Sequence, residues 1–310
     1  KIYTLDKKNK NQFLNEKNIL HIRCDLVNFK KLKKKVIKIN PDIIVHLAAQ
    51  STIDFIEKKK SNYFRDNIVG TKNIVKLSKL LNIQKFIFSS TAAVYKKNNK
   101  NLNEKDKLYP DNLYGWTKLQ NEKFIIKEFK NTKIKYCILR FFNVCSALKN
   151  NIGEFHNPET HLIPKTINSL LKNKSINIYG NKFNTFDGTC LRDYIHVKDI
   201  INGIMLSIKY LNKNKSVIFN LGAGKTLSVS EIVDQCCKVL KKVPIIKIKK
   251  NRKGDIDKLI CNITKAKSKL NWSPKNSNIR QIILDEKKWQ IFLNNKKKRD
   301  LFITNYIYKR

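Results

Sequence analysis

Residues 86–91 read FIFSST, an apolar run that ends in three hydroxyl side chains. Short apolar runs closed by polar residues are typical of buried strands in a parallel sheet. Ligands of open α/β sheets bind at the carboxyl ends of the strands, so we expect these hydroxyls to lie at a binding site. The stretch therefore predicts an α/β protein whose site forms where this strand ends.

Residues 114–118 read YGWTK and place a phenol and an ammonium four positions apart. If this segment is helical, Tyr114 and Lys118 lie on one face. A nearby positive charge would lower the tyrosine pKa from its free value of about 10, which makes a base usable near neutral pH. Thr91 could then hydrogen-bond the same substrate oxygen. A Y-x-x-x-K pair also arises by chance, but one that follows a strand-end hydroxyl by 114 − 91 = 23 residues predicts a catalytic site.

These residues resemble the active site of the extended short-chain dehydrogenase/reductase family, whose members include the NAD-dependent epimerases and dehydratases of nucleotide sugars. More narrowly, residues 89–95, SSTAAVY, resemble the version found in the UDP-glucose 4-epimerases. The resemblance implies that Thr91, Tyr114 and Lys118 are catalytic and that NAD is the cofactor. It also implies a doubly wound parallel sheet of the Rossmann type with a smaller C-terminal substrate domain.

The composition excludes several other classes of protein. The formal net charge is +41, yet 8 of the 65 basic residues are arginines, which leaves 65 − 8 = 57 lysines spread along the chain. No arginine-rich aromatic groove accompanies them, so we expect no specific nucleic-acid partner, only a salt-sensitive attraction to polyanions. No run of eighteen apolar residues and no basic-then-apolar leader occur, so we expect neither a membrane span nor a secretory signal.

The seven cysteines are odd in number and none are spaced as C-x-x-C. This pattern argues against a disulfide framework and against a zinc ribbon. We therefore expect a reducing, cytoplasmic location and no metal site.

Residues 1–6, KIYTLD, read as a strand that ends in an acid. In dinucleotide-binding folds such a carboxylate accepts hydrogen bonds from the adenosine ribose, which makes Asp6 a candidate cofactor ligand. The first of the nine glycines is Gly70, and the only methionine is Met205. We therefore expect an N-terminally incomplete chain that lacks the first strand and the glycine loop. A degenerate protein is the alternative.

Two further strands are expected over residues 21–26 and 41–49, and His46 is expected to be a packed strand residue. The resemblance implies that NAD contacts the ends of these strands, the next helix and the catalytic segment. The implied contacts are Asp6, Asp25, Leu26, Leu47, Ala48, Ala49, Gln50, Ser51, Asn67, Thr91, Tyr114, Lys118 and Phe142.

The pattern loosens from about residue 144, where glycine and prolines interrupt it. We expect residues 1–143 to form the NAD-binding domain, with its sheet completed by part of 190–222. Residues 144–310 would mainly bind the nucleotide sugar. The resemblance implies substrate contacts at Thr91, Tyr114, Asn143, His161, Leu162, Asn177, Ile178, Tyr179, Arg192, Arg252, Asp255 and Leu259.

Arginine is scarce in this chain, and two arginines occur in segments that match the family. Arg192 offers a planar fork of donors suited to a diphosphate, although pairing with Asp193 or Asp199 is the alternative. By resemblance, Arg252 also holds the diphosphate and Asp255 the uridine ribose. Leu259 stands where family members restricted to simple hexoses often have tyrosine, which predicts room for N-acetylated sugars.

The resemblance implies a 4-epimerase that interconverts UDP-glucose and UDP-galactose through a 4-keto sugar, with transient reduction of bound NAD. We expect a homodimer. Another nucleotide-sugar epimerase or dehydratase is an alternative, as is an inactive relative that only binds. Dehydratases need an acid beside the catalytic hydroxyl, whereas Ala92 and Ala93 follow Thr91 here.

Overall fold

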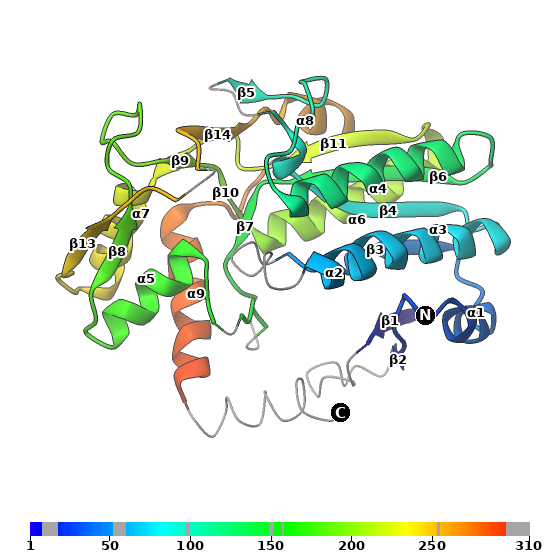
Figure 1. Ribbon diagram of the computed structural model, residues 1–310, viewed down its shortest axis with the longest axis horizontal. Helices are drawn as coiled ribbons and strands as arrows, with labels where there is room; N and C mark the ends of the chain where they lie inside the picture. The colour runs from blue at the N-terminus through cyan, green and yellow to red at the C-terminus, as the bar shows by residue number, and fades with distance from the viewer. Residues whose placement is uncertain are drawn as a thin grey trace.

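A parallel four-stranded sheet in the order β11-β6-β4-β3 forms the centre of the larger lobe. The computed structural model (Figure 1) describes residues 1–7, 18–51, 60–96, 100–148, 152–156, 158–252 and 255–295. The central strands are β3 (Ile43–His46), β4 (Lys85–Thr91), β6 (Lys135–Phe141) and β11 (Val217–Leu221).

Strand β4 is buried on both faces because its apolar side chains alternate between two hydrophobic cores. Phe86 and Phe88 join the core on one face, and Ile87 joins the core on the other. Ser90 continues the first series and hydrogen-bonds Glu122 on the helix that covers that face. The predicted strand at this position is confirmed, with its hydroxyls at the carboxyl end.

Helices cover both faces of this sheet, which confirms the predicted doubly wound α/β fold. The helices of the first face are α1 (Phe29–Ile37), α3 (Gly70–Leu80) and α4 (Leu113–Phe129), and α2 (Lys60–Tyr63) runs through the π-helix η3 (Phe64–Val69) into α3. The helices of the second face are α6 (Val197–Lys213) and α8 (Thr264–Leu270).

A separate parallel pair, β1 (Ile2–Asp6) and β2 (Ile19–Arg23), packs against the first core through Leu5 and Ile22. Asp6 ends β1, as the sequence predicts. Within the described residues β3 pairs with β4 alone, and Val45 is 39% exposed. The strand expected over 41–49 is present but shorter, at Ile43–His46, and it is buried on one face only.

The smaller lobe, seen on the left of Figure 1, packs three helices around a parallel strand pair. Its core gathers isoleucines and leucines from all three helices, among them Ile167, Ile232 and Ile282. The elements are α5 (Leu162–Leu171), β8 (Ile176–Tyr179), α7 (Val229–Leu240), β13 (Ile246–Lys249) and α9 (Ile279–Asn294).

Short strands connect the two lobes. One pair joins β7 (Asn143–Cys145) to β10 (Tyr194–His196), and a small sheet runs in the order β12-β9-β14-β5. The strands of the small sheet are β5 (Asn101–Leu102), β9 (Leu191–Arg192), β12 (Leu227–Ser228) and β14 (Lys258–Cys261). Of the helices described, none has both the length and the apolar character of a membrane span.

Candidate active site

The start of α4 is pressed against the turn that follows β4, and this contact brings Tyr114 to Thr91. The turn is the 3-10 helix η4 (Ala92–Val94). A Cβ on Gly115 would lie 2.3 Å from the carbonyl oxygen of Ala93, so only glycine permits this approach. The side chain of Thr91 hydrogen-bonds that of Tyr114.

Lys118 lies one helical turn beyond Tyr114 and is 2% exposed. Its Nζ donates to the carbonyl oxygen of Ser89 at 2.6 Å and lies 5.9 Å from the centre of the Tyr114 ring. The strand-end hydroxyls, the phenol and the ammonium therefore meet at the carboxyl end of β4.

Burial controls the charge of both groups. Desolvation, with a contribution from Tyr63, raises the pKa of Tyr114 to about 12, although the hydrogen bond from Thr91 acts to lower it. Desolvation also lowers the pKa of Lys118 to about 7, although Glu122 acts to raise it. The predicted lowering of the tyrosine pKa by Lys118 is therefore wrong for the described structure, because loss of hydration disfavours both charged forms.

A buried ion pair supports the catalytic segment, and the sequence reasoning missed it. Arg140 donates through its Nη2 to Glu122 at 2.7 Å, and both side chains are 2% exposed. Glu122 also accepts the hydroxyl of Ser90, next to Thr91. The available signal was an arginine within the apolar strand β6 and an acid one turn after Lys118.

The carboxyl ends of β1 and β3 offer surfaces that fit a dinucleotide. Asp6 places an exposed carboxylate at the end of β1. Leu47 is 54% exposed, and the two small residues after it, Ala48 and Ala49, are exposed as well. An open apolar strand end beside a carboxylate suits an adenosine and its ribose hydroxyls.

Asn67, on the π-helix η3, connects this strand end to the helices. Its side chain accepts from the backbone nitrogen of Gln50 at 2.7 Å and donates to the carbonyl oxygen of the same residue at 3.0 Å. Ser51 follows and is exposed. Asp25 accepts from the backbone of Val27, and the remaining predicted cofactor residues, Leu26 and Phe142, pack against the core clusters near the two ends of the sheet.

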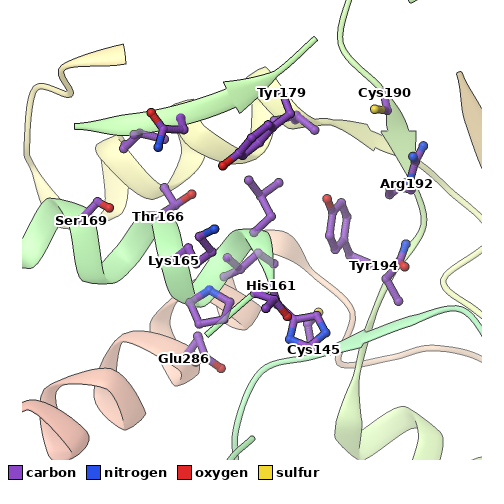
Figure 2. Close-up of a pocket in the computed structure, with 18 of the residues that line it drawn as sticks. Cys145, His161, Lys165, Thr166, Ser169, Tyr179, Cys190, Arg192, Tyr194 and Glu286 are labelled. Carbon is purple, nitrogen blue, oxygen red and sulfur yellow. The ribbon is translucent and has the colours of Figure 1, made fainter. Parts of the chain in front are cut away.

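A cavity of about 260 Å³ is lined by the smaller lobe and by the short strands that join it to the larger lobe (Figure 2). Most of the predicted substrate residues of the second half line it; they are Asn143, His161, Leu162, Asn177, Tyr179, Arg192, Arg252 and Asp255. Ile178 instead points into the core of the smaller lobe and is 3% exposed. Leu259 pairs in register with Arg192 and packs beside Phe142, between the cavity and the catalytic segment.

Two guanidinium groups reach this cavity. Arg192 donates to the carbonyl oxygen of Ile256 at 2.8 Å and pairs with Asp255 at 3.4 Å. The guanidinium carbon of Arg252 lies 4.3 Å from the centre of the Tyr179 ring. Planar donors held in this way suit the oxygens of a diphosphate.

The alternative in which Arg192 pairs with Asp193 or Asp199 is wrong, because both carboxylates accept hydrogen bonds from other groups. Asp193 is fully buried, and its carboxylate accepts backbone N–H groups from Ala223, Gly224 and Cys261. Asp199 accepts from the backbone of Asn276 and from the hydroxyl of Ser277.

Further polar residues line the cavity that the sequence did not single out, among them Lys165, Thr166 and Glu286 (Figure 2). The hydroxyl of Thr166 is buried without a hydrogen-bond partner in the described part of the chain. Burial raises the pKa of Glu286 to about 7. The spacing of these residues in the sequence does not mark them as cavity residues, because only the fold brings them together there.

A doubly wound sheet with a phenol and an ammonium at a strand end defines an enzyme of the dinucleotide-dependent α/β class. Residues 1–222 match the NAD dependent epimerase/dehydratase family, and the chain belongs to this family.

Two relatives within the family are both UDP-glucose 4-epimerases. The chain is 37% identical over 252 residues to a UDP-glucose 4-epimerase of Lactobacillus helveticus, covering 80% of this chain and 76% of that protein. It is 36% identical to one from Halalkalibacterium halodurans, covering 80% of this chain and 75% of that protein.

Solved structures agree as well. A crystal structure of a UDP-glucose 4-epimerase superposes with a TM-score of 0.88 at 34% identity, covering 94% of this chain and 91% of that one. The enzyme of Bifidobacterium longum, in complex with NAD+ and UDP, superposes with a TM-score of 0.87 at 25% identity over the same shares.

Proposed function

We propose that this chain is an NAD-dependent epimerase that interconverts UDP-glucose and UDP-galactose. The observation that carries the proposal is the meeting of Thr91, Tyr114 and Lys118 at the end of β4. The cavity on the side of the smaller lobe holds Arg192 and Arg252, and the similar proteins are UDP-glucose 4-epimerases.

The protein's part in the reaction is to move and hold one proton. Tyr114 as its phenolate would take the proton of the sugar 4-hydroxyl, and as the phenol it would later return that proton, while Thr91 hydrogen-bonds its oxygen. We propose that Lys118, whose Nζ lies 5.9 Å from the Tyr114 ring centre, in its ammonium form offsets part of the burial that disfavours the phenolate. NAD, when bound, would supply the hydride acceptor, and return of the hydride to the sugar would leave no net oxidation.

The cofactor would lie along the carboxyl ends of the strands. We propose that Asp6 and Asp25 with Leu26 hold its adenosine half. The strand-end residues Leu47, Ala48, Ala49, Gln50 and Ser51 would follow its length, with Asn67 behind them. Phe142 would lie beside the nicotinamide with Thr91, Tyr114 and Lys118.

The substrate would be anchored by its nucleotide. We propose that Arg192 and Arg252 bind the diphosphate, Asp255 the ribose, and Asn177 and Tyr179 the base. Asn143, His161 and Leu162 would complete the site, with Leu259 beside the sugar. In this division residues 1–143 mainly serve NAD and residues 144–310 mainly serve the nucleotide sugar. A sugar held only through its nucleotide can present either face.

We also propose that the chain works as a homodimer in the cytoplasm. On the outer surface of η3 and α4, Phe64 is 50% exposed and Trp116 is 40% exposed, and a second copy would cover them. All seven cysteines are free thiols, which suits a reducing compartment. Sedimentation velocity tests the dimer, and a concentration-independent monomer would contradict it.

The test of the activity is Tyr114→Phe in the full chain. We expect epimerisation of UDP-galactose to fall by a factor of about 10² to 10⁴, because the general base is lost. Binding of UDP, measured by calorimetry, should be unchanged. Tyr109→Phe is the matched control, since Tyr109 is 61% exposed and lies just before α4.

Normal turnover by Tyr114→Phe would show that Tyr114 is not the base. A wild-type chain that binds UDP but never interconverts the sugars would favour the relative that only binds.

A further inference from the structure

Two imidazoles and two carboxylates meet at the exposed edge of the cavity, just before α5. Glu154 and His161 line the cavity, and their side chains are 40% and 48% exposed. His156 and Glu159 lie beside them, with side chains 19% and 17% exposed. The proposed reaction uses neither His156 nor the two glutamates.

The side-chain atoms face one another at short range. Glu154 lies between the two rings, with one oxygen 2.6 Å from Nε2 of His156 and the other 3.6 Å from Nδ1 of His161. Glu159 Oε1 lies 3.0 Å from the same Nδ1 of His161. The ligand atoms of Glu154, His156 and His161 all lie within 4.8 Å of one another.

These separations approach those around a tetrahedral zinc ion. Zinc binds histidine nitrogen and carboxylate oxygen at about 2.0–2.2 Å, which places neighbouring ligand atoms roughly 3.3–3.5 Å apart. The observed separations of 2.6 and 3.6 Å between Glu154 oxygens and the two imidazole nitrogens lie on either side of this range. Metal ligands bind in their deprotonated forms, so binding of the ion would release to solvent any proton that they carry.

The backbone that carries these ligands is tied to two helices. The buried Trp289 of α9 donates through its Nε1 to the carbonyl oxygen of Glu154 at 2.7 Å. A Cβ on Gly153 would lie 2.6 Å from the same ring, so the chain passes tightly over it. His161 is the residue that precedes the first turn of α5. Ligands held in this way need little ordering to bind an ion.

The local charge also favours a cation. The charges of Glu154 and Glu159 both act on Glu286, and His161 offsets part of their effect. Gathering carboxylates in this way is unfavourable unless protons or a cation neutralise them.

We propose that Glu154, His156 and His161 bind one zinc ion, because their ligand atoms all lie within 4.8 Å of one another. Two imidazoles and a carboxylate form a ligand set typical of zinc. The three protein ligands leave one coordination position to a water molecule. The ion fixes the segment before α5 at the edge of the cavity.

The test begins with the full chain stripped of metal by a chelator. Titration with Zn²⁺ against a chromophoric chelator should give one ion per chain, and the ion should raise the melting temperature. Replacement by Co²⁺ should give the visible absorption of a tetrahedral site without thiolate-to-metal charge transfer. This spectrum needs no variant, so it does not depend on whether a variant folds.

Two variants locate the ion. His156→Gln and His161→Gln should each weaken zinc binding by at least about tenfold, since each removes a ligand. His21→Gln, the matched control on β2, should bind zinc as the wild type does. Absence of stoichiometric binding, a thiolate charge-transfer band, or variants that bind like wild type would each overturn the proposal.

Discussion

Replacing Lys118 with methionine should make the folded chain more stable near neutral pH. The ammonium is 2% exposed, and its Nζ hydrogen-bonds the carbonyl oxygen of Ser89 at 2.6 Å. Burial lowers its pKa from 10.5 to about 7, so folding has to desolvate a charge that the unfolded chain keeps in water. Methionine fills a similar volume without that charge.

The size of the effect follows from proton linkage. The difference of 10.5 − 7 = 3.5 units corresponds to about 5 kcal/mol. Between these two pKa values the unfolded chain binds the proton and the folded chain does not, so wild-type stability rises with pH across this window. The destabilisation by Lys118 is complete below pH 7 and absent above 10.5. The free energy of unfolding of Lys118→Met minus that of the wild type should therefore fall by about 3 kcal/mol between pH 7 and 9.

The assay is urea unfolding of wild type and variant at pH 6, 7, 8 and 9. Taking the difference between the two proteins cancels the titration of the other lysines. The absolute difference also includes the cost of leaving the Ser89 carbonyl without its donor, about 1–3 kcal/mol, so the slope against pH is the decisive quantity. Lys123→Met, at an exposed position of the same helix, should show no slope. A difference that stays constant from pH 7 to 9 would refute the reasoning.

Two further substitutions test the supporting contacts. Arg140→Met leaves Glu122 buried without its partner and should cost about 3–5 kcal/mol in urea unfolding, whereas the double variant Arg140→Met, Glu122→Met should regain most of it. Leu259→Tyr should lower the turnover of UDP-N-acetylgalactosamine relative to UDP-galactose by about tenfold or more, because the ring fills space beside Arg192. A double variant no more stable than Arg140→Met would contradict the first expectation. For the second, Leu259→Met keeps the volume and should keep the ratio, and a tyrosine that leaves the ratio unchanged would contradict it.

The parts of the fold that sequence predicts well are those set by local pattern. The apolar run that ends in Thr91 became β4, and the Tyr114 to Lys118 spacing became the first turns of α4. An acid ends β1 at Asp6, and His46 is packed in its strand at 4% exposure. Each of these features depends on neighbours in the chain, so the sequence carries the signal directly.

The features that sequence missed depend on contacts between distant segments. The pKa of Tyr114 is set by burial, which spacing cannot reveal. The ion-pair partner of Arg140, Glu122, lies 18 residues away in the chain and on another element. Arg192 pairs with Asp255 and not with Asp193, because backbone amides already hydrogen-bond the Asp193 carboxylate. Such competition becomes visible only once the segments are folded together.

The alternation of β4 between two cores makes enzyme turnover a reporter of correct folding. Sliding the strand by one residue would turn Phe86 and Phe88 toward the second core and Ile87 toward the first. The same slip would carry Thr91 away from Tyr114. A chain with β4 out of register would therefore be both unstable and inactive. A genetic screen for turnover thus also selects for the correct register of this strand. Changes of sugar preference are then best sought in the cavity wall, where sequence can vary without moving the strand.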